Sequence, residues 1–181
     1  MRPIGLVETS SIARGVKCLD EMVKRAPVAV LLARPVCPGR YVILVEGDVA
    51  AVEESFKAGV VVAGDTIVDK LFLANPHPSL PAVLRQAVKP EAFSPVGVVE
   101  TTAVASALFA ADAGCKAAKV ELILVRLAAG MAGKSYVVFS GELPEVEAAV
   151  EAGGAAAKER SKLVETVVLA NPDPLIEMFL V

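Results

Sequence analysis

The residue best suited to metal binding or thiol chemistry is a cysteine in a loop rich in proline and glycine. Cys37 lies in the stretch Pro35-Val36-Cys37-Pro38-Gly39-Arg40, within a loop predicted over residues 34–40. Structural cysteines are normally buried, whereas loops run over the surface, so we expect this thiol to be accessible. An iron–sulfur cluster takes four thiolates, and one chain offers a single thiolate here. One chain therefore cannot ligate a cluster by itself, and a metal role and a bare thiol both stay open.

The other cysteines and the only histidine are weaker candidates. Cys18 and Cys115 fall inside predicted helices, on or beside the apolar stripe, and we expect both to belong to the core. His77 lies in the turn Asn75-Pro76-His77-Pro78. A lone histidine forms neither a metal site nor a catalytic triad, so a surface or interface contact is expected there. Three cysteines, an odd number, argue against a disulfide framework.

The remaining candidates for catalysis do not form a site. Glu8 and Glu100 end the first predicted strand of each half of the chain. Paired carboxylates can perform acid–base chemistry, but these two occupy equivalent places in separate halves, so a structural hydrogen bond to backbone is expected. The glycine-rich stretch 128–134 lacks the register of a phosphate-binding loop and precedes a strand. The sequence also lacks a Ser-His-Asp set, a Cys-x-x-Cys motif and a dinucleotide fingerprint, and we predict that the chain is not an enzyme.

The elements that must position these residues occur twice. Residues 4–9 recur as 96–101, and Leu73-Ala74-Asn75-Pro76 recurs at 169–172. Between these segments, Gly39 corresponds to Gly133, which lies 94 residues later. The offset between the two copies therefore grows in small steps from 92 to 96 residues. Such self-similarity indicates a tandem repeat. We predict a first domain over residues 1–87, a linker over 88–95 that contains two prolines, and a second domain over 96–181.

Each copy predicts the element order strand–helix–strand–strand–helix–strand. The first helix follows from Ile12, Val16, Leu19 and Val23, which recur at helical spacing after a capping serine. This order is typical of an antiparallel sheet with helices on one face, an α+β fold. The predicted elements are strand 4–8, helix 11–24, strands 28–33 and 41–46, helix 49–64 and strand 71–74, then strand 96–100, helix 102–117, strands 120–126 and 135–140, helix 143–158 and strand 164–169.

Composition restricts the class of protein. Hydrophobic residues make up 55% of the chain and charged residues 22%, which excludes disorder. A mean hydropathy of +0.59 without an apolar run of about 20 residues favours burial against other subunits over a membrane span. A net charge of -3 and a pI near 5.3 do not suggest the basic patch that a nucleic-acid-binding protein needs. The first residues lack the apolar stretch of a signal peptide, so the expected location is the cytoplasm.

The repeated pattern resembles the bacterial microcompartment shell (BMC) domain. The matching segments are 5–9, 20–26 and 47–52 in the first copy, and 97–101, 112–116 and 141–143 in the second. The resemblance implies two tandem ferredoxin-like βαββαβ BMC domains that form a pseudohexameric trimer. It implies a structural tile of a microcompartment shell, with other shell proteins and encapsulated redox enzymes as partners. Within the tandem class, the loop around Cys37 is most similar to the T-type shell proteins of propanediol-utilisation microcompartments.

The same resemblance assigns roles to particular residues. It implies one [4Fe-4S] cluster per trimer, held at a central pore by Cys37 from each of three subunits, for transfer of electrons or of a cluster across the shell. The implied pore loops comprise Pro35, Val36, Cys37, Pro38 and Gly39 together with Ala129, Gly130, Met131, Ala132 and Gly133. The implied contacts at tile edges comprise Lys24, Lys116, Asn75, His77 and Asn171. The family usually carries an arginine between prolines where Asn75 and Asn171 stand.

Two other functions stay open at this point. The first is a shell tile with an open pore for metabolites, in which Cys37 only lines the pore. The second is a small ligand-binding or signalling trimer built on ferredoxin-like repeats. Iron analysis separates the first from a tile that holds a cluster, and sheet formation separates tiles from a signalling trimer.

Overall fold

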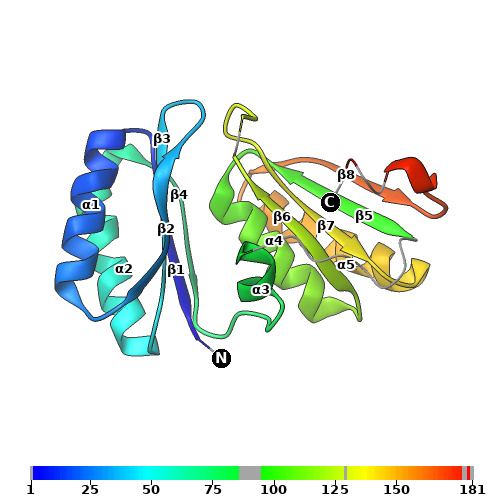
Figure 1. Cartoon of the computed structure of the whole chain (residues 1–181), viewed down its shortest axis with the longest axis horizontal. Coiled ribbons are helices and arrows are strands. Elements are labelled where there is room, and N and C mark those ends of the chain that lie inside the picture. Colours follow the sequence, from blue (N-terminus) through cyan, green and yellow to red (C-terminus); the bar gives the residue numbers. More distant parts are fainter. Residues whose placement is uncertain (1, 86–94, 129, 177–178, 180–181) are drawn as a thin grey trace. The chain divides into compact units, whose positions relative to one another are not determined.

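The structure is a computed structural model that describes residues 2–85, 95–128, 130–176 and 179. Two compact units share the chain (Figure 1). Unit 1 comprises Met1–Pro76 with the short segments Ala103–Ala105 and Ala128–Gly133, and unit 2 comprises the remainder. No helix in the described part of the chain is both long and apolar enough to cross a bilayer.

The first repeat is a four-stranded antiparallel sheet with two helices on one face (Figure 1). The strands lie in the order β2-β3-β1-β4, which leaves β2 and β4 at the edges. The helices α1 and α2 pack against each other and close the core. The bounds are β1 Ile4–Thr9, α1 Ile12–Arg25, β2 Ala29–Val36, β3 Arg40–Glu46, α2 Val49–Ala63, a short 3-10 helix η1 Gly64–Thr66, and β4 Ile67–Leu73.

The second repeat has the same layout, with strands in the order β6-β7-β5-β8. A short helix, α3 Leu80–Arg85, precedes it and packs on β6. The bounds are β5 Val96–Thr101, α4 Val104–Ala117, β6 Glu121–Leu127, β7 Ser135–Ser140, α5 Leu143–Glu159, β8 Leu163–Leu169 and a 3-10 helix η2 Pro174–Ile176. The predicted βαββαβ order is confirmed in both copies. The predicted linker 88–95 lies almost wholly outside the described residues, so the domain boundaries stay a prediction.

Two predicted strands ended or began three or more residues away from the observed bounds. The strand predicted to end at residue 33 continues to Val36, so the predicted loop 34–40 shrinks to a turn of three residues, Cys37–Gly39. Pro35 fits within β2 because β2 is an edge strand, where a missing backbone N–H costs no ladder bond. The strand predicted at 71–74 begins at Ile67 instead, because two polar residues, Asp69 and Lys70, hide the apolar alternation.

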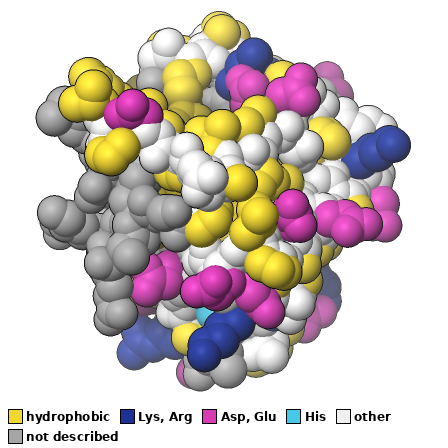
Figure 2. All heavy atoms as spheres, turned by 90° about the vertical axis from the view of Figure 1, so that its right-hand side faces the viewer, with side chains coloured by type: hydrophobic (Ala, Val, Ile, Leu, Met, Phe, Trp, Pro, Cys, Tyr) yellow, Lys and Arg dark blue, Asp and Glu magenta, His cyan; other side chains and the backbone are white. Residues whose placement is uncertain are grey.

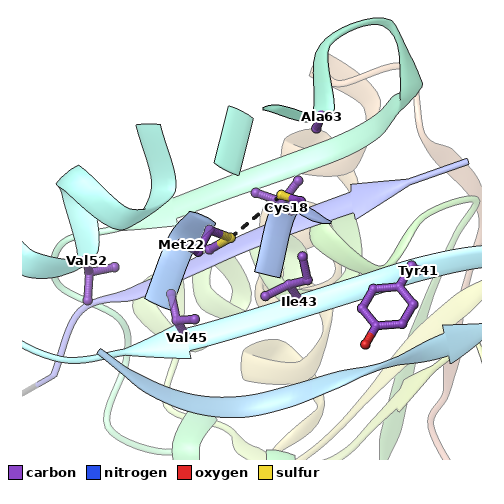
Figure 3. Packing of buried hydrophobic residues seen from close by; sticks show 8 residues of the cluster. Cys18, Met22, Tyr41, Ile43, Val45, Val52 and Ala63 are labelled. Carbon is purple, nitrogen blue, oxygen red and sulfur yellow. Dashed lines mark hydrogen bonds between the residues drawn. The ribbon is translucent and has the colours of Figure 1, made fainter. Parts of the chain in front are cut away.

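The first helix buries a different face from its apolar stripe. Gly15, Cys18 and Met22 face the core, whereas Ile12 and Val16 of the stripe are exposed. Figure 3 shows Cys18 and Met22 above Ile43 and Val45 of the sheet. Burial raises the pKa of the Cys18 thiol to about 11, and it raises that of Cys115 to about 11 as well. The prediction that both cysteines belong to the core is confirmed.

Glycines set how closely the two helices of each repeat approach. A Cβ at Gly153 of α5 would lie 2.9 Å from the carbonyl oxygen of Ala110 in α4. The equivalent glycine of the first repeat is Gly59, where a Cβ would lie 2.6 Å from Sδ of Met22. The Cys18 thiol donates to the Gly59 carbonyl oxygen at 3.2 Å. Each crossing therefore has no room for a methyl group.

We expect Gly153→Ala to lower the free energy of unfolding by about 1–3 kcal/mol, the usual cost of overpacking. The added methyl group meets backbone, which cannot rotate away, and this outweighs the better helix propensity of alanine. Denaturant unfolding measures the change. Gly47→Ala is the control, since its Cβ would meet its nearest neighbour at an ordinary 3.4 Å. Equal stability of the two variants would contradict the close crossing.

Candidate functional site

Cys37 occupies the tip of the hairpin that joins β2 to β3. The strands pair up to Val36 and Arg40, which leaves only Cys37–Gly39 for the turn. Gly39 closes it with φ of 80°, a left-handed conformation that glycine adopts without strain. The Cys37 side chain is exposed and its thiol is free. The structure thus places an accessible thiol at the end of a short and well-paired hairpin.

A buried ion pair anchors the base of this turn. Glu8, near the end of β1, is fully buried, and its Oε1 receives a hydrogen bond from Nη1 of Arg40 at 2.9 Å. Its Oε2 accepts the backbone N–H of Val104, which belongs to the same unit, at 2.9 Å. Desolvation raises the pKa of the Glu8 carboxyl, and the bonds from Arg40 and Val104 oppose that rise. The first residue after the turn is therefore held to the sheet by a charge that water does not reach.

The second repeat has an equivalent ion pair that is more exposed to solvent. Nζ of Lys134 lies 2.9 Å from Oε1 of Glu100, and both side chains are partly exposed. The backbone hydrogen bond predicted for the two glutamates is present for Glu8, but the cationic partners were missed. Arg40 and Lys134 each follow an equivalent glycine, and that repeated position is the signal that would have revealed them.

The loop after β6 is the second predicted pore loop. It runs from Ala128 to Lys134, which is the glycine-rich stretch singled out in the sequence. Positive φ values at Gly130 and Gly133 explain the two glycines, whereas Ala128 and Ala132 adopt positive φ although they carry a Cβ. Within unit 1, a Cβ at Gly133 would lie 2.8 Å from Nη1 of Arg40. The base of this loop therefore meets the arginine that anchors the Cys37 turn. Met131 is partly exposed, and Ala129 lies outside the described residues.

The predicted edge residues fall into two groups. Lys24 and Lys116 end equivalent helices, and each forms an ion pair of 2.6 Å with the aspartate four residues earlier, Asp20 and Asp112. The first pair is exposed, whereas Asp112 of the second is buried. His77 lies in unit 2, where its backbone N–H donates to Asp112 and its Nδ1 lies 2.8 Å from the hydroxyl of Ser79. Asn75 and Asn171 are exposed. None of these contacts tests the predicted edge role.

Among the described residues, no three His, Cys, Asp or Glu side chains converge as a metal site would require. A site built on Cys37 needs ligands from more than one chain, and the donor chemistry suits that arrangement. The thiol is accessible, a thiolate is the ligand that iron–sulfur clusters use, and each chain contributes one.

Comparison with known proteins identifies the class. The model of the BMC domain family matches twice, over residues 3–76 and 95–172. The bacterial microcompartment shell protein PduT of Citrobacter freundii is 40% identical over 172 residues, covering 93% of this chain and 92% of that protein. The chain therefore belongs to the BMC domain family and carries two copies of the domain.

Solved structures agree with this assignment. A microcompartment protein from Desulfitobacterium hafniense aligns with a TM-score of 0.88 at 40% identity, over 98% of this chain and 99% of that one. The fused permuted hexameric shell protein MSM0275 from the RMM microcompartment shares the fold, with a TM-score of 0.67 at 20% identity over 87% of this chain and 84% of that one. The resemblance predicted from sequence is confirmed, and a structural role in a microcompartment shell is supported.

We expect Arg40→Met to raise the pKa of Glu8 further, because it removes the strongest effect that opposes desolvation. A carboxyl whose pKa is raised on folding contributes stability below its ordinary value of 4.5, and this is lost as the pH rises through the folded pKa. The variant should therefore lose stability more steeply than wild type above pH 4.5. Near neutral pH, the loss should reach about 3–5 kcal/mol, the usual cost of an unpaired buried charge.

Denaturant unfolding from pH 4 to 8 measures this dependence. Glu8→Gln with Arg40→Met should flatten the profile, since the buried charge is gone. Arg25→Met is the matched control, because Arg25 pairs with Glu54 at the same 2.9 Å, where both side chains are exposed. Parallel profiles for wild type and Arg40→Met would show that Glu8 does not depend on Arg40.

Proposed function

We propose that the chain is a homotrimeric tile of a microcompartment shell in which Cys37 from each of three subunits holds one [4Fe-4S] cluster at a central pore. The observation that carries the proposal is the accessible thiol at the tip of a short hairpin, in a chain with two shell domains. Other shell proteins and encapsulated redox enzymes are the proposed partners.

The chain's own residues favour convergence of three thiols. The turn has three residues, and Glu8 and Arg40 fix its base, so little conformational entropy is lost when three copies meet. Three thiolates leave one iron for a ligand that is not protein. When bound, the cluster would supply electron transfer across a wall whose pore stays closed to metabolites. The open metabolite pore is the alternative that the iron measurement addresses.

Iron and sulfide analysis of protein purified without oxygen tests the cluster. We expect about four irons per three chains in wild type and none in Cys37→Ala, because every subunit loses its ligand at once. Cys18→Ala and Cys115→Ala are the controls, since both thiols are buried in the core and should leave the iron content unchanged. Iron-free wild type after reconstitution would favour the open pore. Iron that persists in Cys37→Ala would overturn the assignment of the ligand.

The edge role of Lys24 has its own test. Its ammonium is exposed and forms an ion pair with Asp20 on the same helix, so Lys24→Ala should leave the fold intact and reduce the formation of sheets. Lys57→Ala is matched, because Lys57 forms a similar exposed pair with Glu53 on α2. Electron microscopy of both variants gives the measurement. Sheets that form equally well in both would count against Lys24 as an edge contact.

Lys116 requires a separate variant. It pairs with Asp112, a buried carboxylate that also accepts the His77 N–H. Removing this lysine would disturb unit 2 as well as any edge contact. The stability of Lys116→Ala must therefore be measured before its sheets are compared with those of Lys24→Ala.

A further inference from the structure

The two repeats bury equivalent surfaces to very different degrees. In the first repeat, Val23 of α1 and Val30 of β2 are 43% and 42% exposed. Their equivalents in the second repeat, Cys115 and Leu122, are 6% and 2% exposed. We call the region around Asp20, Val23 and Val30 the α1–β2 surface. The exposed side chains of Ile12 and Val16 extend it along the helix.

In the second repeat, the segment that follows the first sheet covers this region. The backbone N–H of His77 donates to Oδ1 of Asp112 at 2.7 Å. The hydroxyl of Ser79 lies 3.7 Å from the sulfur of Cys115. The helix α3 then packs on β6, with Leu80 fully buried. A turn and a short apolar helix therefore seal the surface that the first repeat leaves open.

The same turn recurs at the C-terminal end of the chain. The carbonyl of His77 accepts the N–H of Leu80 at 3.1 Å, and the carbonyl of Asp173 accepts the N–H of Ile176 at 3.0 Å. The His77 ring accepts the N–H of Ser79 at 3.4 Å. In the same way, the Asp173 carboxylate accepts the N–H of Leu175 at 2.9 Å. Residues 77–80 and 173–176 thus share one conformation, 96 residues apart.

In the described part of the chain, this second copy of the turn leaves its apolar side chains exposed. Leu175 is 68% exposed and Phe179 is 78% exposed. Figure 2 views the side on which β8 lies in Figure 1 and shows apolar side chains at the surface among acidic ones. We call residues 173–176 with Phe179 the C-terminal segment. One chain therefore exposes both an uncovered surface and the element that covers its equivalent.

We propose that the C-terminal segment of one chain docks on the α1–β2 surface of a second copy of the chain, as residues 77–83 dock on α4 and β6 within unit 2. This inference rests on the proposed trimer and names a contact that joins its chains. The two surfaces differ, so the contact is head-to-tail and can close into a ring.

Asp20 supplies the polar anchor of this contact. Lys24 donates to its Oδ2 at 2.6 Å, as Lys116 donates to Oδ2 of Asp112 at 2.6 Å. Oδ1 of Asp112 receives the N–H of His77. By equivalence, Oδ1 of Asp20 receives the N–H of Asp173 from the second copy, and Leu175 meets Val23 where Ser79 meets Cys115. Leu175 and Val23 together give an apolar contact in place of the weak bond between hydroxyl and thiol.

The test is a disulfide between chains. Val23→Cys with Leu175→Cys, in a Cys37→Ser background that removes the exposed thiol, places two thiols where the equivalent pair is 3.7 Å apart. Mild oxidation should convert the chain into covalent trimers on a denaturing gel without reductant. Ser79→Cys calibrates the conditions, because it should form a disulfide with Cys115 inside one chain. The matched control joins Leu175→Cys to Val61→Cys. Val61 is 80% exposed and its equivalent Ala155 is exposed too, so the repeat comparison places it outside the contact.

A second variant measures the same contact without crosslinking. Leu175→Asp should weaken the assembly at least about tenfold, because it removes a buried leucine and adds a charge. Val61→Asp should have no effect. Light scattering measures the association of both variants and of wild type over a range of concentrations.

The outcomes separate this inference from the proposed trimer. Covalent trimers with Val23→Cys/Leu175→Cys but not with the Val61 pair, together with weaker association of Leu175→Asp, support the contact. Monomer bands from a sample that light scattering finds trimeric overturn the contact and leave the trimer intact. Wild type that stays monomeric at high concentration overturns both.

Discussion

A buried carboxylate at the end of β1 sets the conditions for the candidate site. Glu8 lies in the interior of unit 1, where an ionised group is stable only with good partners, and Arg40 and the Val104 N–H supply them. Arg40 is also the first residue after the Cys37 turn, so the pair that neutralises Glu8 fixes the hairpin that carries the thiol. The pairing in the second repeat, between Glu100 and Lys134, is more exposed and therefore weaker.

The protein uses one fold twice under different constraints. The close approach of α1 to α2 and of α4 to α5 is common to both repeats, because equivalent glycines stand at each crossing. What differs is the outer surface of each first helix. The turn at His77 and α3 seal it in the second repeat, whereas Val23 and Val30 remain exposed in the first. A shell tile needs surfaces for its neighbours, and exposed apolar side chains of this kind are typical of them.

Much of this protein follows from its sequence alone. The offsets between the repeats and the order of elements were available from the spacing of a few segments, because local periodicity and turn residues specify them. The family was inferred from the resemblance of those segments to the BMC domain. The accessible thiol was predicted from the prolines and glycine around Cys37, and the structure confirms its exposure. The core positions of Cys18 and Cys115 were predicted from helical spacing.

The tertiary structure decided the rest, for reasons that local patterns do not contain. The stripe of Ile12, Val16 and Val23 fixes a helix but not its buried face, which Gly15 and Met22 occupy because Tyr41 and Gly59 lie opposite them. Pro35 argued for a loop, and only the place of β2 at the sheet edge allowed a strand. The bonds from Glu8 to Arg40 and from His77 to Asp112 join residues more than 30 positions apart. Pairings at that distance depend on how the chain folds back on itself, and apart from the repeated position of Arg40 and Lys134 after an equivalent glycine, no local spacing indicates them.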